Sequence, residues 1–367
     1  MKISIGSKII EGPYGGGNEF IKNLTFRLNQ DGHKVINNLE DDDIDIIILI
    51  NPLRDSELST FNNFDINYYL AFKNPLAITV HRINECDERK NTNYVNNEII
   101  QANKYIDSNI YVSSWLKNLY LDQGIANKES SLIKGGPNNK IFNLNGKKAW
   151  NKKEKLKIVT HHWSDNWMKG FDYYQKLDTL CSSKKWRDKI EFTYIGNIPK
   201  NLEFKNSNVL SPMSGDYLAE ELKKHHIYIT GSINEPSGNH HMEGAMCGLP
   251  ILYINSGALP EYCSEYGLEF DENNLEQRIS QIIDSYDIYF EKLNSYPFSF
   301  DYAYKSLLTH LENLISNKKE IYKRRKNLNK FKILFSYFVN HLIIYTYKKK
   351  NSIKKALGKI KKKLIRI

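Results

Sequence analysis

Two glutamates, Glu235 and Glu243, lie eight residues apart in a glycine-containing stretch between positions 227 and 262. The interval alone is uninformative, because it also separates Glu11 from Glu19. Pro236 sets the pair apart, since a proline disfavours helical geometry at the residue before it and so keeps the Glu235 carboxylate on a loop. A loop carboxylate of this kind can orient ligand hydroxyls and place negative charge beside a developing cation.

The residues between the two glutamates suit a phosphate ligand. Ser237 and Gly238 allow close approach of the backbone, and a helix predicted over 240–246 offers free N–H groups and a partial positive charge at its start. Glu243 would lie about two turns or less into that helix, near enough to turn back toward a ligand hydroxyl. The plainer alternative is a solvated loop acid followed by an acid on the helix surface.

The elements that position these residues form a strand–loop–helix–strand unit. The apolar run 227–230 predicts a buried strand, Gly248 and Pro250 end the helix, and 250–254 predicts the next strand. Such a unit belongs to a parallel α/β sheet, and its loop lies at the carboxyl end of a strand. Open α/β sheets bind their ligands at that edge.

Three motifs in this stretch, Glu-Pro-Ser-Gly, Glu-Gly-Ala-Met-Cys-Gly-Leu-Pro and Ser-Gly-Ala-Leu-Pro-Glu, together resemble the motif of retaining nucleotide-sugar glycosyltransferases with the GT-B fold, family-4 type. The resemblance implies that Glu235 is catalytic at the donor sugar and that Glu243 holds the ribose hydroxyls. It also implies that Ser237, Gly257 and Ala258 approach the donor sugar or its phosphates.

The donor diphosphate has a second set of expected contacts. Lys169-Gly170, between a strand predicted over 156–160 and a helix from Phe171, resembles the family's Lys-Gly pair, which holds the diphosphate. Together with Gly238, Lys169 is therefore expected at the phosphates. The sequence departs from the family pattern at Ser164, where an arginine usually stands. One cation neutralises two phosphates less well than two cations do.

The N-terminal half contributes a glycine loop and a histidine. A strand predicted over 2–10 leads to Gly16 and Gly17, with Asn18 expected to cap the next helix. The resemblance implies that these glycines face the donor diphosphate, and the alternative is a plain turn. His81 follows a strand predicted over 76–80 and resembles the family histidine that contacts the donor sugar, so we expect it to be catalytic; the alternative is a structural histidine.

Metal binding and disulfide bonding are not expected. Three pairs of adjacent histidines occur, at 161–162, 225–226 and 240–241, but neighbouring side chains diverge and no ligand set is completed. The four cysteines are scattered, which is typical of a reducing compartment, and the N-terminus does not read as a signal peptide. A cytoplasmic protein without a cofactor is expected, with the nucleotide-sugar as a substrate.

The positive charge of the chain is concentrated at its C-terminus. Of 52 Lys and Arg residues, 18 lie in 317–367 with a single acid, Glu320, so the remainder holds 34 basic and 41 acidic residues and is net −7. A nucleic-acid partner is therefore not expected. The apolar and aromatic run 331–347 between lysine clusters predicts a peripheral anchor on the anionic inner face of a membrane, and the alternative is a disordered basic tail.

The expected architecture is α/β: two Rossmann-like domains over 1–150 and 151–300 that face each other across a cleft, a helix over 301–326 that crosses back, and a basic amphipathic tail over 327–367. The expected activity is retaining hexosyl transfer from a nucleotide-sugar to a glycan or lipid-linked acceptor, in surface polysaccharide or lipopolysaccharide-type synthesis. Two alternatives stay open: a nucleotide-sugar epimerase or phosphorylase on the same fold, and a non-catalytic membrane-bound binding subunit.

Overall fold

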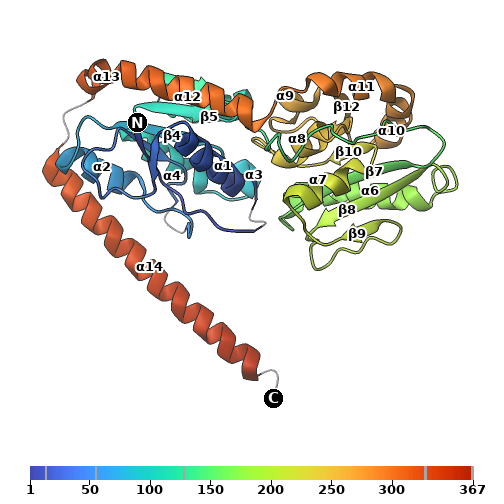
Figure 1. Cartoon of the computed structure of the whole chain (residues 1–367). Helices are drawn as coiled ribbons and strands as arrows, with labels where there is room; N and C mark the ends of the chain where they lie inside the picture. The colour runs from blue at the N-terminus through green and yellow to red at the C-terminus, as the bar shows by residue number, and fades with distance from the viewer. Residues whose placement is uncertain (13–14, 54–55, 127–128, 326–328, 365–367) are drawn as a thin grey trace.

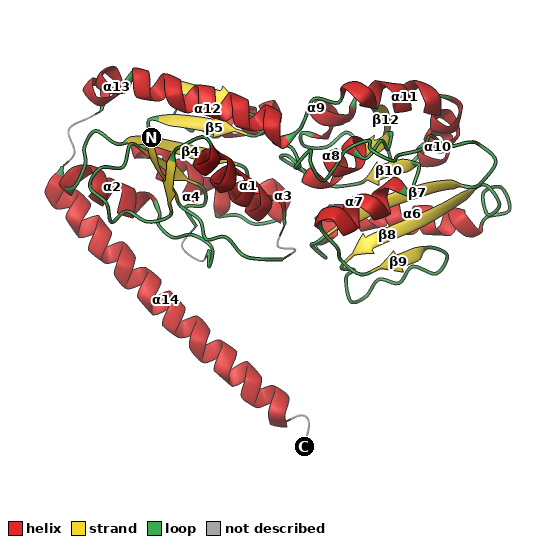
Figure 2. Ribbon diagram, in the orientation of Figure 1, coloured by secondary structure: helices red, strands yellow, loops and turns green. Residues whose placement is uncertain are grey.

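The computed structural model describes residues 1–12, 15–53, 56–126, 129–325 and 329–364. The chain forms two halves, each built on a parallel six-stranded sheet, and a long C-terminal helix that leaves the body of the molecule (Figures 1 and 2). The order of strands in each sheet is not the order in sequence, so the strands are joined by crossover connections with helices. This is the α/β architecture that the sequence predicts.

The first sheet has the strand order β2-β1-β3-β4-β5-β6. Its strands are β1 (Lys2–Ile5), β2 (Lys34–Ile36), β3 (Ile46–Leu49), β4 (Ile78–Ile83), β5 (Ser108–Tyr111) and β6 (Glu129–Leu132). The helices of this half are α1 (Gly16–Gln30), α2 (Asn63–Phe72), α3 (Asp87–Lys90), α4 (Val95–Ala102) and α5 (Ser114–Asp122). Alternate residues of β3 enter two different cores, which is why its sequence is apolar throughout.

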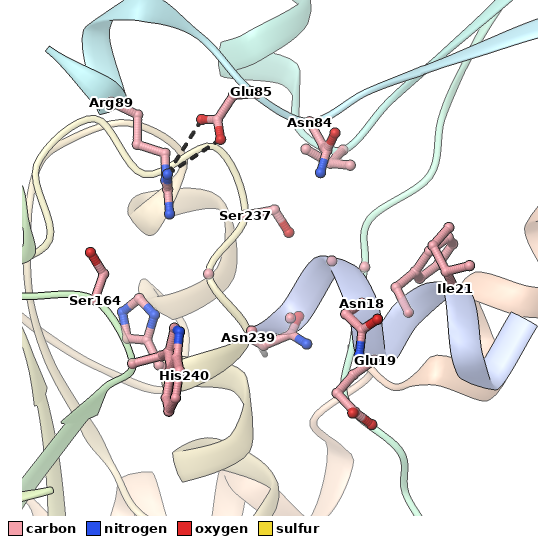
Figure 3. Close-up of a pocket in the computed structure, with 18 of the residues that line it drawn as sticks. Asn18, Glu19, Ile21, Asn84, Glu85, Arg89, Ser164, Ser237, Asn239 and His240 are labelled. Atoms are coloured by element: carbon pink, nitrogen blue, oxygen red, sulfur yellow. Dashed lines mark hydrogen bonds and ion pairs between the residues drawn. The ribbon is translucent and has the colours of Figure 1, made fainter. Parts of the chain in front are cut away.

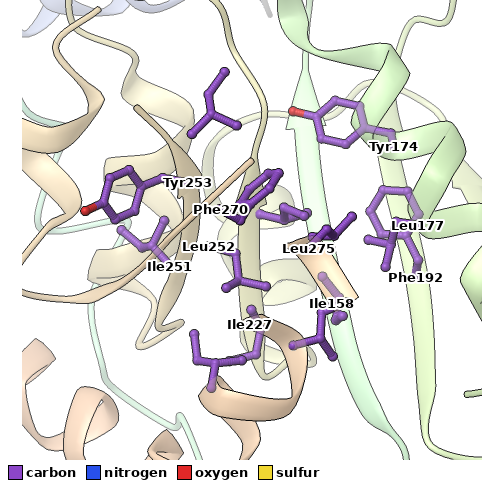
Figure 4. Close-up of a cluster of buried hydrophobic side chains, with 14 of the residues drawn as sticks. Ile158, Tyr174, Leu177, Phe192, Ile227, Ile251, Leu252, Tyr253, Phe270 and Leu275 are labelled. Carbon is purple, nitrogen blue, oxygen red and sulfur yellow. The ribbon is translucent and has the colours of Figure 1, made fainter. Parts of the chain in front are cut away.

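The second sheet has the order β12-β11-β10-β7-β8-β9. Its strands are β7 (Leu156–His162), β8 (Ile190–Gly196), β9 (Asn208–Leu210), β10 (Ile227–Thr230), β11 (Ile251–Ile254) and β12 (Gly267–Phe270). The helices of this half are α6 (Phe171–Ser182), α7 (Gly215–Lys223), α8 (Asn239–Met246), α9 (Leu259–Cys263), α10 (Leu275–Asp284) and α11 (Tyr286–Lys292). One large core joins residues of β7, β10 and β11, such as Ile158, Ile227 and Leu252, to α6 and α10 (Figure 4).

The chain then returns to the first half. Helix α12 (Phe300–Ser316) packs in one core with β1, β3 and α1, and its His310 ring lies between the hydroxyl groups of Ser108 and Ser131 at 2.9 and 2.8 Å. The chain first leaves this half through the segment between β6 and β7, which contains Pro137. Where the chain crosses back, the N–H of Phe300 donates to the carbonyl of Pro137 at 2.8 Å. A Cβ on Gly136 would lie 2.5 Å from the Ser299 backbone, so the two crossings lie in direct contact.

Several local predictions were wrong at element boundaries; the strand predicted over 2–10, for example, ends at Ile5. Helix α1 begins at Gly16 rather than after Asn18, because the Asn18 amide exchanges two hydrogen bonds with the backbone of Ile10, at 2.9 and 2.7 Å. Strand β4 runs on to Ile83, since its last residues still pair with β5, so His81 lies within the strand. The amphipathic pattern over 275–290 could form one helix, but the structure has two, α10 and α11, that meet at Ser285.

The tail is helical in the residues that the structure describes. Helix α13 (Lys318–Arg324) is followed by α14 (Lys330–Leu364), which begins beside α2 and then projects away from the body (Figure 1). The predicted boundary at 326–327 lies outside the described residues. Within the described part of the chain, no helix combines the length and the apolarity needed to cross a membrane.

Candidate active site

A cavity of about 490 Å³ lies between the two halves, at the carboxyl ends of β4, β7 and β10 (Figure 3). The sequence-predicted residues that line it are Gly16, Gly17, His81, Lys169, Glu235, Ser237, Gly238 and Glu243. These side chains and loops come from opposite halves of the chain, so only folding brings them together. Ser164, at the place where the family pattern has arginine, lines the same cavity.

Glu235 is the most tightly held acid of this cavity. Its side chain is 5% exposed. Lys169 Nζ lies 2.6 Å from one carboxylate oxygen, and Arg89 Nε lies 3.4 Å from the other. Burial alone would raise the pKa of Glu235, but the charges of Lys169 and Arg89 outweigh it and lower that pKa to about 2. The carboxylate is therefore ionised at neutral pH, and each of its oxygens faces a cation.

The backbone around Glu235 explains why the motif needs Gly257 and Ala258. The N–H of Ala258 donates to the Glu235 carbonyl at 2.8 Å, and Ser256 Oγ accepts from the N–H of Asn234 at 2.8 Å. A Cβ on Gly257, which has φ +61°, would lie 2.4 Å from the Glu235 nitrogen. Among the described residues that line the cavity, Gly257 and Ala258 do not occur; the structure places them against the backbone of the loop that carries Glu235.

Lys169 reaches Glu235 through an equally close backbone contact. It ends a short 3₁₀ turn, Trp167–Lys169, which the Asn166 side chain caps. Gly170 follows with φ +91°, and a Cβ there would lie 2.2 Å from the Gly231 carbonyl oxygen at the end of β10. Burial lowers the pKa of Lys169, and Glu235 opposes that change. Gly170 thus lets the loop after β7 pack against the loop after β10, and this packing brings the Lys169 ammonium group to the Glu235 carboxylate.

Two helix N-termini converge on the cavity from opposite halves. Helix α1 starts at Gly16 and helix α8 at Asn239, and a Cβ on Gly16 would lie 2.8 Å from the Asn239 amide nitrogen. No side chain caps either helix, and Gly238 stands directly before α8. Helix N-termini carry unsatisfied N–H groups and a partial positive charge, which together suit an anion such as a phosphate.

Glu243 is fixed on α8 by a histidine. His161 Nε2 lies 2.6 Å from a Glu243 carboxylate oxygen, and His161 Nδ1 lies 3.1 Å from the Tyr228 hydroxyl. The His161 side of this contact comes from β7, which runs two residues beyond the predicted strand. The Glu243 carboxylate is thus held at the cavity wall. The contact with His161 uses only one of its two oxygens, Oε2.

The other histidines of the paired sets hydrogen bond within the second half. His240 Nε2 lies 2.9 Å from Thr230 Oγ1, and His162 Nε2 lies 2.7 Å from the Tyr174 hydroxyl. Burial lowers the pKa of both rings well below the usual value, so these two are neutral and add no positive charge to the cavity. In the residues that the structure describes, no group of three or more His, Cys, Asp or Glu side chains is arranged to hold a metal ion.

The sequence reading did not identify Arg89. It lies on α3, and its guanidinium also meets the Glu85 carboxylate at 3.3 Å (Figure 3). Asp87 fixes this segment, because its carboxylate accepts from the backbone N–H groups of Val95 and Asn96 at 2.9 and 3.0 Å. The available signal was the charged run 85–90 directly after a buried strand, at the sheet edge where ligands bind.

No known family profile matches the chain, and no curated protein matches its sequence. Solved structures do match in fold. Sucrose-phosphate synthase from Thermosynechococcus elongatus is 14% identical with a TM-score of 0.60, over 86% of this chain and 99% of that one. The Anabaena protein Alr3699/HepE in complex with UDP is 11% identical with a TM-score of 0.63, over 85% and 100%. The lipopolysaccharide outer core galactosyltransferase WaaB is 11% identical with a TM-score of 0.59, over 84% and 100%.

These likenesses extend over nearly the whole length of each neighbour and over both sheets of this chain. They confirm the predicted fold class, which is the α/β GT-B fold of two facing Rossmann-like halves. At 11 to 14% identity they establish the fold and leave the reaction to be argued from the site.

Proposed function

We propose that this protein is a retaining glycosyltransferase that moves a hexosyl group from a nucleotide-sugar to a hydroxyl group of a glycan or lipid-linked acceptor. The observation that carries the proposal is the ionised Glu235 carboxylate, paired with Lys169 at 2.6 Å, in a cavity onto which two helix N-termini converge. Anionic donor phosphates and a sugar with developing positive charge need these two kinds of group side by side. A structural neighbour with the same fold has been solved with UDP-glucose bound.

The phosphate end of the donor would lie where the helices meet. Lys169, the N–H groups after Gly238 and those of Gly16 and Gly17 would stabilise the diphosphate as the bond to the anomeric carbon breaks and the electron pair leaves with the phosphate oxygen. Glu243, already oriented by His161, would accept hydrogen bonds from the ribose hydroxyls.

The sugar end of the donor would lie between Glu235, His81 and Ser237. Glu235 is better suited to orient sugar hydroxyls and to balance the cationic anomeric carbon than to attack it, because both carboxylate oxygens already face cations. His81 on β4 lines the cavity from the opposite half and would contact the sugar. Gly257 and Ala258 would act by holding the Glu235 backbone in place.

The proposal is tested by donor binding followed by product analysis. Thermal unfolding against UDP-, GDP- and CMP-sugars identifies the nucleotide, and NMR of the product formed on a glycan acceptor reports the anomeric configuration. Retention at the anomeric carbon with acceptor-dependent release of nucleoside diphosphate supports the proposal. Acceptor-independent release with inversion at another sugar carbon indicates an epimerase, transfer to inorganic phosphate a phosphorylase, and tight binding without turnover a binding subunit.

We also propose that α14 attaches the enzyme to an anionic membrane, in keeping with a role in surface glycan synthesis on the cytoplasmic face. One side of α14 packs on α2: Tyr337 stacks on Tyr68 at 4.5 Å between ring centroids, and Ile333 is buried. The opposite side carries an exposed apolar stripe whose members recur every three or four residues: Phe331, Phe335, Phe338, Leu342 and Tyr345.

The charge around this stripe argues for lipid rather than a second copy of the chain. Lys330 and Lys332 lie at one end of it and Lys348 and Lys349 at the other, and the segment 329–349 contains no acid. Two such helices would repel each other, whereas each Lys or Arg near an anionic surface contributes about 1 kcal/mol to binding. An apolar face rich in aromatic residues, flanked by lysines, is typical of helices that lie in the membrane interface.

The stripe can be altered without removing the face that packs on α2. Replacing Phe335 and Phe338 by Glu should abolish sedimentation with phosphatidylserine-containing vesicles while hydrolysis of the donor is retained; replacing Ser336 by Glu is the matched control. If the double variant still sediments, the helix is not the anchor. A halving of the solution mass in the double variant would instead identify the stripe as a dimer interface.

A further inference from the structure

Arg82 is a buried cation without an acidic partner. It lies in β4 next to His81, the residue is 8% exposed, and it lines the cavity. Its guanidinium carbon lies 3.9 Å from the ring centroid of Phe20 on α1. Across the residues that the structure describes, no carboxylate lies within ion-pair distance of Arg82, and none of its nitrogens donates a hydrogen bond. Every other arginine that lines the cavity is paired, since Arg89 meets Glu85 and Glu235.

Such an arrangement is costly in the protein alone. A charge taken out of water loses hydration, and only an opposite charge or several hydrogen bonds restore it. Burial lowers the pKa of Arg82 to about 10, with only the Tyr262 side chain opposing the change, so the guanidinium remains charged at neutral pH. The aromatic face of Phe20 offsets part of the cost, since a cation over a ring gains roughly 1 kcal/mol.

The surroundings of Arg82 offer an anion more than one donor. Phe20 belongs to the first turns of α1, whose N-terminus at Gly16 opens onto the same cavity without a side-chain cap. The Tyr262 side chain, which interacts electrostatically with Arg82, has its hydroxyl 3.0 Å from Oγ of Ser237, another residue that lines the cavity. A planar guanidinium matches two oxygens of a phosphate, and the helix N-terminus adds N–H groups for the third.

We propose that Arg82 and the N-terminal turn of α1 form an oxyanion subsite for a phosphate group, on the wall of the cavity opposite Lys169. The subsite deepens the proposed function and rests on it for the choice of substrates: the phosphate belongs either to the acceptor or to the departing diphosphate of the donor. An acceptor phosphate would make this chain selective for phosphorylated acceptors and would leave the donor diphosphate to Lys169 and the N-terminus of α8. A donor phosphate would make Arg82 the second cation that Ser164 fails to provide.

The test uses full-length protein, with inorganic phosphate and inorganic pyrophosphate as probes. Arg82→Met keeps an apolar stem on Phe20 and removes the charge, so it should raise the melting temperature without ligand and remove the increase that phosphate produces in the parent protein. Titration calorimetry should report at least about a tenfold loss of phosphate affinity, because a charged bidentate contact is lost. Arg187→Gln, an exposed arginine of the second half paired with Asp188, is the matched control and should change neither quantity.

Two outcomes overturn the subsite. A lower melting temperature of Arg82→Met together with unchanged phosphate affinity identifies Arg82 as a structural residue. Unchanged phosphate affinity in Arg82→Gln, which keeps a polar head in the same place, leads to the same conclusion should the methionine variant fail to fold.

Repeating the titration at saturating nucleoside diphosphate separates the two sources. Phosphate that still binds, with nucleoside diphosphate affinity unchanged in Arg82→Met, assigns the subsite to the acceptor. Phosphate that is excluded, with nucleoside diphosphate affinity also reduced, assigns it to the donor. A protein that binds phosphate through Arg82 but binds no nucleoside diphosphate would retain the subsite and overturn the proposed function.

Discussion

The two walls of the cavity differ in how their charges are compensated. Glu235 of the second half meets Lys169 of the same half at 2.6 Å and Arg89 of the first half at 3.4 Å, so its charge is balanced before any ligand arrives. On the first half, Arg82 lies against Phe20 and faces no carboxylate among the described residues. Preorganised groups cost little when a reaction begins, whereas an uncompensated buried charge is stabilised only by the ligand. This difference is the basis of the roles we propose, which are chemistry for Glu235 and recognition of an anion for Arg82.

The largest effect is expected at Glu235. Glu235→Gln keeps the shape of the side chain but removes the charge between Lys169 and Arg89, so turnover should fall by at least about tenfold while nucleoside diphosphate affinity stays within about threefold. Steady-state kinetics with direct nucleotide titration measures both, and Glu220→Gln on the exposed surface of α7 is the control. Equal losses of binding and turnover would mean that Glu235 contacts the phosphates and that the comparison between the walls fails.

Lys169→Ala should act on affinity rather than on turnover alone. Without this ammonium the donor loses its cation on the second wall, and we expect the dissociation constant for nucleoside diphosphate to rise about tenfold and to depend less on salt. Phosphate binding through Arg82 should persist, which would sharpen the distinction between the walls. Lys185→Ala, which removes an exposed surface ion pair to Glu276, is the matched control. Unaltered affinity in Lys169→Ala would assign the diphosphate to the arginines.

Glu243→Ala should weaken nucleotide binding more modestly. Two ribose hydrogen bonds to a carboxylate correspond to a loss of roughly fivefold to tenfold in affinity after the return of water. The measurement is titration with the nucleoside diphosphate and with inorganic pyrophosphate, which lacks the ribose. A loss confined to the nucleotide supports the assignment, and an equal loss for both probes would show that Glu243 acts through the position of α8.

The smallest effect concerns acid stability. The pKa of Glu235 is lowered from 4.5 to about 2 in the folded protein, so its ionised form contributes stability above the unfolded value of 4.5 and that contribution is lost as the pH falls toward 2. Between these values the free energy of unfolding of the parent should therefore fall more steeply with decreasing pH than that of Glu235→Gln. Urea denaturation at several acidic pH values measures the difference, and identical slopes would contradict the buried ion pair.

The sequence predicts the ends of strands and loops well where neighbouring residues determine them. Strand β10 occupies the predicted run 227–230, and the loop that carries Glu235 is marked by Pro236. Boundaries set by long-range contacts were missed. Asn18 is a good capping residue by type, but its amide binds the backbone of Ile10 instead.

The cations of the site illustrate the same limit. Lys169 is identifiable because a glycine follows it in a short motif, and the close contact of Gly170 with Gly231 is the physical reason for that motif. Arg89 reaches Glu235 from 146 residues away in sequence, and no spacing rule connects them. Arg82 is unpaired because no carboxylate of the described residues lies near it, and the sequence alone does not show which side chains surround it.

The direct contact between the two chain crossings, at Gly136 and Ser299, has a mechanical consequence. Two covalent connections that touch each other act as one pivot, so one half can rotate about it but cannot slide past the other. The contacts that would part in such a rotation include Arg89 with Glu235 and the Asn234 amide with the Glu88 carbonyl, at 3.2 Å. Opening would thus expose Glu235 and separate it from Arg89, so that access to the cavity and the pairing of Glu235 with Arg89 change in the same motion.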